Sequence, residues 1–453
     1  MTFPCYPKYR TSGIEWLDQV PDHWSSVPIK YMALERNSLF LDGDWIESKD
    51  ISSDGIRYIT TGNVGEGAYK EQGAGFISEE TFHALGCTEV YEGDVLVSRL
   101  NNPIGRACVV PDLGGRVVTS VDNVIFRPDS KFDKKFIVYL FSSEEYFKHT
   151  SNLARGATMQ RISRGLLGNI RVVTPSFEEQ TQIARFLDHE TARIDALIEE
   201  QQRLIELLKE KRQAVISHAV TQGLDPMAPM KDSGVEWLGE VPAHWTVRKV
   251  SVDFLASKGP RGALLTKEYC HENAGEYPVY SGQTENGGIL GEIADFDIDL
   301  GAEGAILSTT VGAKAMSVMH ISGRISLSQN CMIIRPLSSD VKVRFFFYHF
   351  QPLFSLERRM IPDHMQPSFR MEDLYSFRVA VPPVSEQNQI AEYLDAAVNR
   401  FDELIGEGDN GIALLQERRS ALISAAVTGK IDVRDWQPPA STQTPEFEVA
   451  EAH

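Results

Sequence analysis

The sequence predicts two α/β (α+β) domains separated by two long helices, which form an antiparallel coiled coil and relate the two halves of the chain by a pseudo-twofold axis. Three observations lead to this fold class. A chain of 453 residues is too long for one ordinary hydrophobic core. A short motif and a long segment each occur twice. The long segment has a helical heptad pattern in both copies, whereas the residues between the repeats are typical of short strands joined by Gly-rich turns.

The short motif opens each half of the chain. YRTSGIEWLDQVPDHW at residues 9–24 returns as MKDSGVEWLGEVPAHW at residues 230–245, with nine of the sixteen positions identical. Tryptophans more often fill a core than bind a ligand, so we expect buried anchors at Trp16, Trp24, Trp237 and Trp245. The polar residues of the motif lie in this repeated scaffold, away from the basic loops described below, so we do not assign acid–base chemistry to Glu15, His23, Glu236 and His244.

The long segment, residues 175–225, recurs without a gap at residues 382–432. Apolar residues at alternating steps of four and three predict a helical seam that includes Leu197, Leu204 and Leu404. A helix of about 40 residues spans roughly 60 Å. Such a helix is long enough to set a fixed distance between two bulky domains.

Three glycines weaken the second copy of this helix, namely Gly406, Gly408 and Gly411. Each costs a helix about 1 kcal/mol relative to alanine, so we expect the helix to bend or break there and to need a partner. For an isolated helix, an oligomerisation coiled coil is the ordinary interpretation. Two copies in one chain can pair with each other instead, and we therefore predict an antiparallel pair within a monomer.

The two segments between the repeats, about residues 25–174 and 246–381, share an order of elements but not their residues. Each has strand-like stretches, then a helical stretch, and then a polar loop followed by another strand. In the first segment the strand-like stretches lie at 56–62 and 93–99, the helical stretch at 134–149 and the polar loop at 154–165. In the second segment the strand-like stretches lie at 304–314 and 332–336, the helical stretch at 343–350 and the polar loop at 358–370.

The charge of the chain is distributed unevenly. A net charge of −18 argues against binding to nucleic acid if it is taken as one number, because phosphates are neutralised by Lys and Arg. Residues 99–171, however, contain 12 Lys/Arg and 6 Asp/Glu, and residues 304–378 contain 9 and 5. The acidic excess lies elsewhere, with 13 Asp/Glu and 5 Lys/Arg from residue 382 to the end.

Two polar clusters in each basic stretch have side chains suited to phosphates or base edges, since Arg pairs well with guanine and Gln with adenine. For each of them, a solvated loop residue or a structural cap is the alternative interpretation. The candidates in the first segment are Arg99, Asn101, Asn102, Arg106, Arg155, Thr158, Gln160, Arg161 and Arg164. Those in the second are Thr309, Thr310, Lys314, Arg358, Arg359, Gln366, Ser368 and Arg370.

The repeated motifs resemble a known family. SGxEWLGxxPxHW, GLDP at 223–226, EQxxIAxxLD at 179–188 and 386–395, and the repeat endings AVTQGLD and AVTGKID together resemble the specificity subunits of type I restriction-modification systems, the HsdS family. The resemblance implies target recognition domains at 1–174 and 226–381 and conserved spacer helices at 175–225 and 382–436. Residues 437–453 are expected to form a disordered tail.

The same resemblance implies the function and the partners. Each target recognition domain is expected to read one half of a bipartite asymmetric site in double-stranded DNA. Two methyltransferase subunits are expected to bind the helices, and restriction subunits to join through them. S-adenosylmethionine, ATP and Mg²⁺ are expected on those partners, with no cofactor, metal or catalytic residue in this chain.

The absence of several sequence motifs argues against some classes of function. The sequence has no DPPY-type or NPPY-type motif to hold a flipped adenine, since residues 101–104 are NNPI, and it has no phosphate-binding loop of the GxxxxGK[ST] type. The five cysteines have no metal-ligand spacing. No apolar run is long enough to span a membrane, and no signal peptide is evident, so a cytoplasmic location without membrane contact is expected.

Two other hypotheses remain open at this stage. The chain could be a self-contained DNA-modifying enzyme of unfamiliar design, which would act without partners. It could also be a coiled-coil scaffold that does not bind DNA, in which case the locally basic loops have no role.

Overall fold

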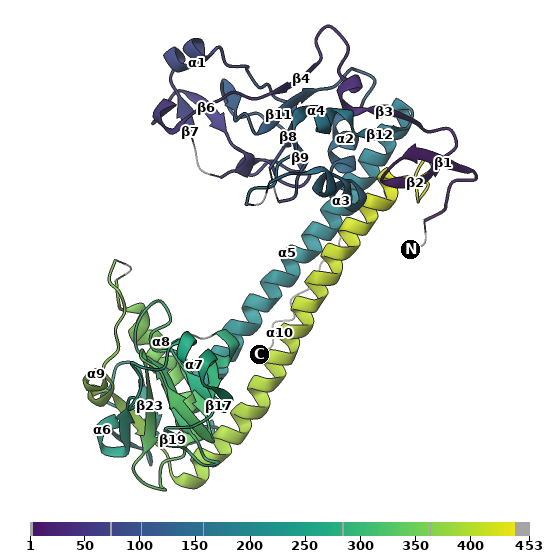
Figure 1. The fold of residues 1–453 in the computed structure, drawn as a ribbon. Coiled ribbons are helices and arrows are strands. Elements are labelled where there is room, and N and C mark those ends of the chain that lie inside the picture. The colour runs from purple at the N-terminus through teal and green to yellow at the C-terminus, as the bar shows by residue number, and fades with distance from the viewer. Residues whose placement is uncertain are drawn as a thin grey trace. The chain divides into compact units, whose positions relative to one another are not determined.

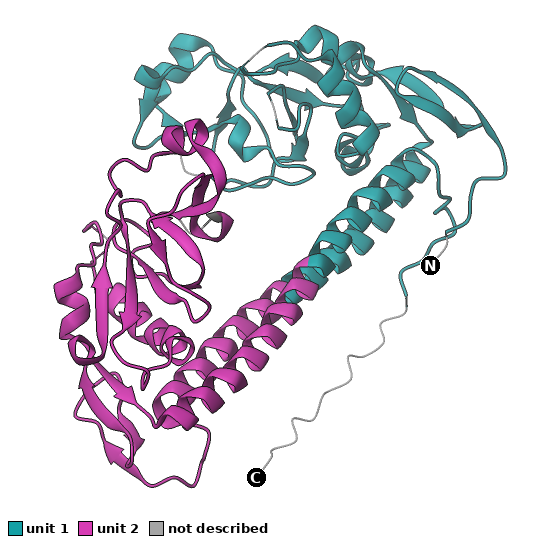
Figure 2. Ribbon diagram, turned by 60° about the horizontal axis from the view of Figure 1, so that its bottom comes forward, with its two compact units in different colours: residues 1–201, 410–453 teal, residues 202–409 magenta. Residues whose placement is uncertain are grey.

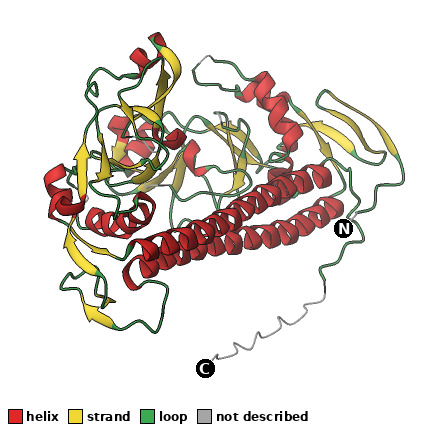
Figure 3. Cartoon of the chain, turned by 90° about the horizontal axis from the view of Figure 1, so that it is seen from below, coloured by secondary structure: helices red, strands yellow, loops and turns green. Residues whose placement is uncertain are grey.

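The computed structural model describes residues 3–72, 75–100, 102–156, 158–282, 285–362 and 364–439. The chain divides into a first unit, residues 1–201 with 410–453, and a second unit, residues 202–409 (Figure 2). The long helices α5 (Phe177–Gln222) and α10 (Val384–Val427) each pass through both units. Strands, shorter helices and loops make up the remainder of each unit (Figure 3).

The first unit contains two four-stranded sheets (Figure 1). One is antiparallel, in the order β4 (Leu39–Asp42), β11 (Asn123–Arg127), β8 (Val95–Ser98) and β9 (Ala107–Val109). The other has a parallel pair at one edge, in the order β10 (Val117–Thr119), β6 (Ile56–Ile59), β7 (Gly75–Ile77) and β5 (Ile51–Ser52). Two-stranded pairs are formed by β1 (Tyr9–Ile14) with β2 (Leu17–Pro21) and by β3 (Ser25–Pro28) with β12 (Arg171–Thr174). The helical segments include η1 (Ile29–Met32), α1 (Glu79–Leu85), α2 (Lys134–Leu140), α3 (Glu144–Leu153) and α4 (Arg164–Asn169).

The second unit repeats this plan. Its antiparallel sheet has the order β16 (Phe254–Ser257), β23 (Cys331–Pro336), β20 (Ala305–Thr309) and β21 (Val318–Ile321). Its other sheet has the order β18 (Ile289–Ile293), β17 (Ala274–Tyr280), β22 (Arg324–Leu327) and β19 (Ile298–Asp299). The two-stranded pairs are β13 (Met230–Asp232) with β14 (Glu240–Pro242) and β15 (Thr246–Lys249) with β24 (Arg378–Val381). The helices are α6 (Val250–Asp253), α7 (Lys267–Glu272), α8 (Val343–Arg359) and α9 (Met371–Ser376). The mixed α/β architecture in two copies is therefore confirmed.

The long helices pack against each other as an antiparallel pair within each unit. In the first unit the α5 residue Ile183 shares a core with Val427 of α10, and Arg419 Nε lies 2.8 Å from Asp195 Oδ1. In the second unit Ile216, Ala219 and Val220 of α5 share a core with Ile390, Leu394 and Val398 of α10. The predicted pairing of the two copies within one chain is confirmed.

The expected break in the second helix is wrong. Helix α10 runs without interruption from Val384 to Val427, through Gly406, Gly408 and Gly411. Packing of apolar residues against α5 on both sides of these glycines offsets their low helix propensity, since tertiary contacts routinely override that preference.

The predicted heptad seam is also wrong in the middle of the helices, where Leu197, Leu204 and Leu404 are exposed. The buried residues of α5 instead include Ile183, Ile194, Ile205 and Ile216, which recur every eleven residues. Eleven residues complete about three turns of a straight α-helix, whereas a heptad pattern drifts around it. Helix α5 therefore keeps one face inward through an eleven-residue spacing.

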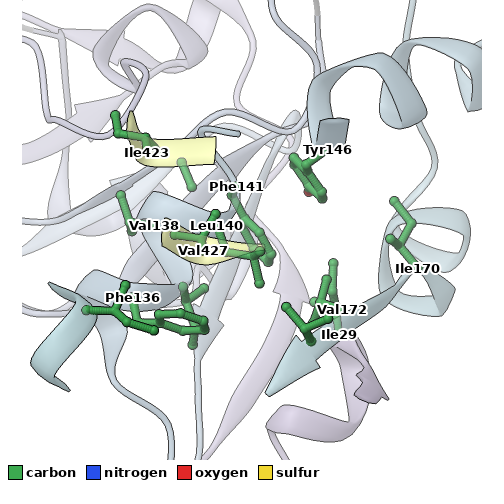
Figure 4. Close-up of a cluster of buried hydrophobic side chains, with 14 of the residues drawn as sticks. Ile29, Phe136, Val138, Leu140, Phe141, Tyr146, Ile170, Val172, Ile423 and Val427 are labelled. Atoms are coloured by element: carbon green, nitrogen blue, oxygen red, sulfur yellow. The ribbon is translucent and has the colours of Figure 1, made fainter. Parts of the chain in front are cut away.

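The core of the first unit joins its globular part to the helices. Phe136, Val138 and Leu140 of α2 gather with Ile423 and Val427 of α10 (Figure 4). The short motif belongs to the same core through Trp24, which is buried. Trp245 is likewise buried in the second unit, whereas Trp16 and Trp237 are only partly buried against the two cores.

The repeated EQxxIAxxLD motif attaches each globular part to its helix. Glu179 accepts hydrogen bonds from Tyr6 Oη at 2.8 Å and Trp24 Nε1 at 2.9 Å, and it pairs with His23 Nε2 at 2.9 Å. Gln180 Oε1 accepts from the backbone N–H of Asp133 at 2.9 Å. Glu386 pairs in the same way with His244 at 2.8 Å, and Gln387 Oε1 accepts from the N–H of Lys342 at 2.8 Å. The last residue of the motif binds a tyrosine in both units, since Tyr139 donates to Asp188 at 2.8 Å and Tyr348 to Asp395 at 2.6 Å.

Candidate nucleic-acid interface

The first unit brings its two predicted polar clusters together. The end of β8 and the loop before α4 are joined by a bridge between Leu100 and Arg161. The N–H of Ile162 donates to Arg99 O at 3.0 Å, and the N–H of Arg99 donates to Asp122 O at 2.8 Å. These backbone contacts around Arg99, Asp122 and Arg161 are called the first frame below.

A network of alternating charges occupies the first frame. Arg161 Nη2 is paired with Asp122, and Arg99 Nη2 lies 3.9 Å from the same carboxylate. Arg99 Nε lies 3.3 Å from Asp42 Oδ1, and Arg164 Nε lies 3.5 Å from Asp42 Oδ2. The order is therefore Arg161, Asp122, Arg99, Asp42 and Arg164, with three cations and two anions.

Burial differs along this network. The side chain of Arg99 is 8% exposed, whereas those of Arg161 and Arg164 are 41% and 40% exposed. Desolvation lowers the pKa of Arg99, with Asp42 opposing the shift, but arginine stays protonated. Arg99 thus holds the two carboxylates from inside, and the outer arginines face solvent with a net positive charge.

The remaining candidates of the first unit differ in their placement. Arg106 is buried and donates to four backbone carbonyls, those of Val64 at 2.6 Å, Leu100 at 2.9 Å, Pro103 at 3.1 Å and Thr61 at 2.8 Å. It shapes the loop after β8 and could reach DNA only by giving up these bonds. Arg155 and Arg161 exchange backbone hydrogen bonds of 3.0 and 2.9 Å, which close a loop whose exposed residues include Arg155, Thr158 and Gln160. Asn102 is also exposed, and Asn101 lies outside the described residues.

The second unit builds an equivalent frame from other residues. A bridge joins Val311 to Ser368. The N–H of Phe369 donates to Thr310 O at 2.7 Å, and the N–H of Thr310 donates to Asn330 O at 2.8 Å. These contacts around Thr310, Asn330 and Ser368 are called the second frame. They repeat those of the first frame one by one, so Thr310 corresponds to Arg99, Asn330 to Asp122, and Ser368 to Arg161.

The candidates of the second unit again divide into inner and outer residues. Thr309 and Thr310 are buried, and Thr309 Oγ1 accepts from the N–H of Ser317 at 3.0 Å. Arg358 is partly buried and donates to Ala313 O at 3.4 Å. Arg370 is exposed and pairs with Asp373 at 3.3 Å. The other exposed candidates are Lys314, Arg359, Gln366 and Ser368.

The polar clusters predicted from the sequence do not include the acidic members of the charge network, Asp42 and Asp122. Carboxylates repel phosphate, so neither was a candidate for contact with DNA. A signal for Asp122 was present, because DNVIFRP at 122–128 and NCMIIRP at 330–336 align and place Asp122 opposite Asn330.

None of the helices in the described part of the chain combines the length and apolar character needed to cross a bilayer. Within the same residues, no group of three or more His, Cys, Asp or Glu side chains is arranged to hold a metal ion.

Comparison with known protein families shows which family the chain belongs to. A family model described as "Type I restriction modification DNA specificity domain" matches residues 39–208 and 243–412. The chain belongs to this family. Both loops of each frame in this type I specificity protein lie within the matched ranges.

Individual relatives agree with the family assignment. The specificity chain is 21% identical over 441 residues to the "Putative type I restriction enzyme MjaX specificity subunit" of Methanocaldococcus jannaschii, covering 92% of this chain and 96% of the relative. It is 28% identical over 147 residues to the type I restriction enzyme MpnII specificity subunit of Mycoplasma pneumoniae, covering 32% of this chain and 42% of the relative.

Two solved structures share the fold of the specificity chain. One comes from work titled "Structural basis underlying complex assembly and conformational transition of the type I R-M system"; its TM-score is 0.70 at 16% identity, covering 91% of this chain and 99% of that chain. The crystal structure of the HsdS subunit from Thermoanaerobacter tengcongensis has a TM-score of 0.51 at 16% identity, covering 91% and 98%.

Proposed function

We propose that this specificity chain reads a bipartite asymmetric site in double-stranded DNA, one half-site with each frame. The observation that carries the proposal is the duplication of the frame with exchanged side chains. The backbone contacts of Arg99, Asp122 and Arg161 are repeated by Thr310, Asn330 and Ser368. A constant backbone with different donors and acceptors is what two readers of different base sequences require, because bases are distinguished by hydrogen-bond pattern.

In this proposal the chain contributes recognition and its partners contribute the chemistry. Two methyltransferase subunits, which use S-adenosylmethionine, would methylate adenine at the site that this chain selects. Restriction subunits, which use ATP and Mg²⁺, would join through them. The long helices would serve both as the docking surface for the methyltransferase subunits and as the spacer that sets the number of unread base pairs.

The charge distribution supports weak binding by the chain alone. The net charge of the chain is −18, and two of the three arginines in the first frame share carboxylates with the buried Arg99. Few cations are therefore available for phosphates, whose neutralisation dominates affinity for DNA. A gel shift should show weak binding by the purified chain and tight, sequence-specific binding once the methyltransferase subunits are added. No shift under either condition would favour a scaffold that does not bind DNA.

A domain exchange tests the modular part of the proposal. Residues 246–381 are replaced by the corresponding segment of an unrelated specificity subunit, and the methylated adenines in cells that express the chain with its methyltransferase partner are located by sequencing. One half of the methylated site should change while the other half and the spacing stay the same. A simultaneous change of both halves would contradict the assignment of one reader to each unit.

Two further experiments separate the remaining roles. Insertion of eleven residues at matched positions in each long helix, one step of the eleven-residue spacing, should lengthen the unread gap and leave the recognised bases unchanged, whereas an unchanged gap would contradict the spacer role. Incubation of the purified chain with DNA, a divalent metal and a labelled methyl donor should give no turnover. Cleavage or methyl transfer without partners would instead support a self-contained enzyme.

A further inference from the structure

The two frames differ by a coordinated exchange of charge. Asp42 lies three residues after Leu39, which pairs with Arg127, and Lys258 lies three residues after Leu255, which pairs with Arg335. These two strand registers place Lys258 where the first unit has Asp42. Arg164 and Met371 are the first residues of α4 and α9. All five members of the charge network are thus replaced in the second unit, by Lys258, Thr310, Asn330, Ser368 and Met371.

In the second unit both partners of each ion pair are replaced, so none of these pairs has a counterpart there. Arg161 and Asp122 pair in the first unit, and their counterparts Ser368 and Asn330 are both neutral. The buried Arg99 requires carboxylates around it, because an uncompensated buried charge is strongly destabilising. Its counterpart, the buried Thr310, does not. The network therefore changes as a set, as expected for residues that perform one task together.

The exposed end of the network has the chemistry of a guanine reader. Guanine presents two acceptors, O6 and N7, in the major groove, and two parallel N–H groups of one guanidinium match them. Arg161 gives an Nη2 hydrogen to Asp122, and no described residue accepts a hydrogen bond from Nη1. A guanidinium held by a carboxylate loses less freedom on binding than an unrestrained one. Asp122 is in turn held from inside by Arg99.

We propose that Arg161 reads a guanine in the half-site of the first unit and that Asp122 is the positioning residue that aims it. The second unit, with Ser368 and Asn330 at these positions, has no guanidinium to present two parallel N–H groups at this point of its frame. The inference rests on the proposed function and extends it to named residues and a named base.

The test uses the full chain in complex with its methyltransferase partner, with the sequences of methylated sites as the readout. Wild-type complex comes first, because a lack of sequence-specific methylation would be a failure of the proposed function and not of this inference. Given a defined site, the half-site assigned to the first unit by domain exchange should contain a guanine. A half-site without guanine would overturn the inference.

Three variants then locate the reader and its support. Arg161→Ala and Arg161→Gln should lower the preference for guanine at one position by about 10- to 100-fold, because alanine has no donor and glutamine matches adenine rather than guanine. Asp122→Asn keeps the size of the side chain but removes its charge, and it should relax the same position. The other half-site should stay unchanged in all three.

The matched control is Glu79→Gln, which changes a carboxylate to an amide in another ion pair of the first unit, 2.8 Å from Arg116. It should leave the recognised sequence unchanged. If Asp122→Asn lowers the melting temperature but every base preference remains that of the wild type, Asp122 has only a structural role and the inference is overturned. If Asp122→Asn fails to fold, Arg161→Gln decides, because glutamine keeps a hydrogen-bond donor opposite Asp122 but matches adenine rather than guanine. Retained guanine preference in that variant overturns the inference.

Discussion

Replacement of Glu179 by alanine should release the N-terminal hairpin β1–β2 from the first unit. The two donors to Glu179 Oε1, Tyr6 Oη and Trp24 Nε1, lie on either side of this hairpin in the sequence. Both side chains are buried, so water does not readily replace the lost acceptor. A buried donor without a partner costs about 1–3 kcal/mol. His23 is about two-fifths exposed and can turn to water, so it adds little.

The expected loss for the two orphaned donors is therefore about 2–6 kcal/mol. This loss corresponds to an increase of roughly 30- to 25,000-fold in the opening equilibrium of the hairpin. Hydrogen exchange followed by mass spectrometry measures this opening directly, on peptides that cover residues 9–21. The method is preferable to one global unfolding curve, because a chain with two compact units need not unfold in a single step.

The second unit provides a matched control in the same molecule. Glu386 has the corresponding position, but among the described residues its side chain has a single hydrogen-bond partner, the half-exposed His244 at 2.8 Å. Trp245 Nε1 has no hydrogen-bond partner among the described residues even with Glu386 in place. Glu386→Ala should therefore cost less than about 1 kcal/mol and accelerate exchange in β13–β14 by less than about 5-fold. Equal effects of the two substitutions, or a change of less than about 5-fold in β1–β2 for Glu179→Ala, would refute the reasoning.

Three further predictions concern stability. Burial lowers the pKa of His349 to about 3. Between pH 3 and about 6.5 the unfolded chain therefore binds a proton at this residue that the folded chain does not. The free energy of unfolding is unaffected by this histidine above pH 6.5 and is lower by about 1.4 kcal/mol at pH 5.5. His349→Leu should flatten the dependence of the urea midpoint on pH between 7 and 5.5, and an unchanged slope would contradict it. An added Cβ at Gly406 or Gly411 meets nothing within 4 Å, so Gly→Ala at either should stabilise by about 0.5–1 kcal/mol; a lower melting temperature would count against this. Gly105 has φ +86°, and a Cβ there would lie 2.9 Å from a buried tyrosine ring, so Gly105→Ala should destabilise the first unit by about 2–4 kcal/mol. Gly13 has φ +68° but nothing within 4 Å of an added Cβ, so Gly13→Ala should destabilise it less. Comparable losses in thermal unfolding would exclude a steric cause.

Local patterns in the sequence were sufficient for the elements and their duplication. Strand stretches such as 93–99 and 332–336 became β8 and β23, and the predicted helical stretches became α2, α3 and α8. These features depend on neighbours a few residues apart, so periodicity and turn residues reveal them. The loop arginines were found for the same reason, because their type and local density are visible without a fold.

The tertiary structure decided which of those residues face outward and which partners hold them. Arg99 and Arg161 both belong to a basic stretch, yet one is buried between Asp42 and Asp122 and the other is partly exposed. The partners in these ion pairs are 23–57 residues apart in the sequence, and no local pattern connects them. The continuity of α10 through its glycines also depends on packing against α5. The sequence by itself determined two similar units, two paired helices and a set of polar loops, because these follow from local chemistry and repetition. Only the tertiary structure determined that the loops meet in a frame and that the frame exchanges its charges as a set, because both depend on contacts between distant residues.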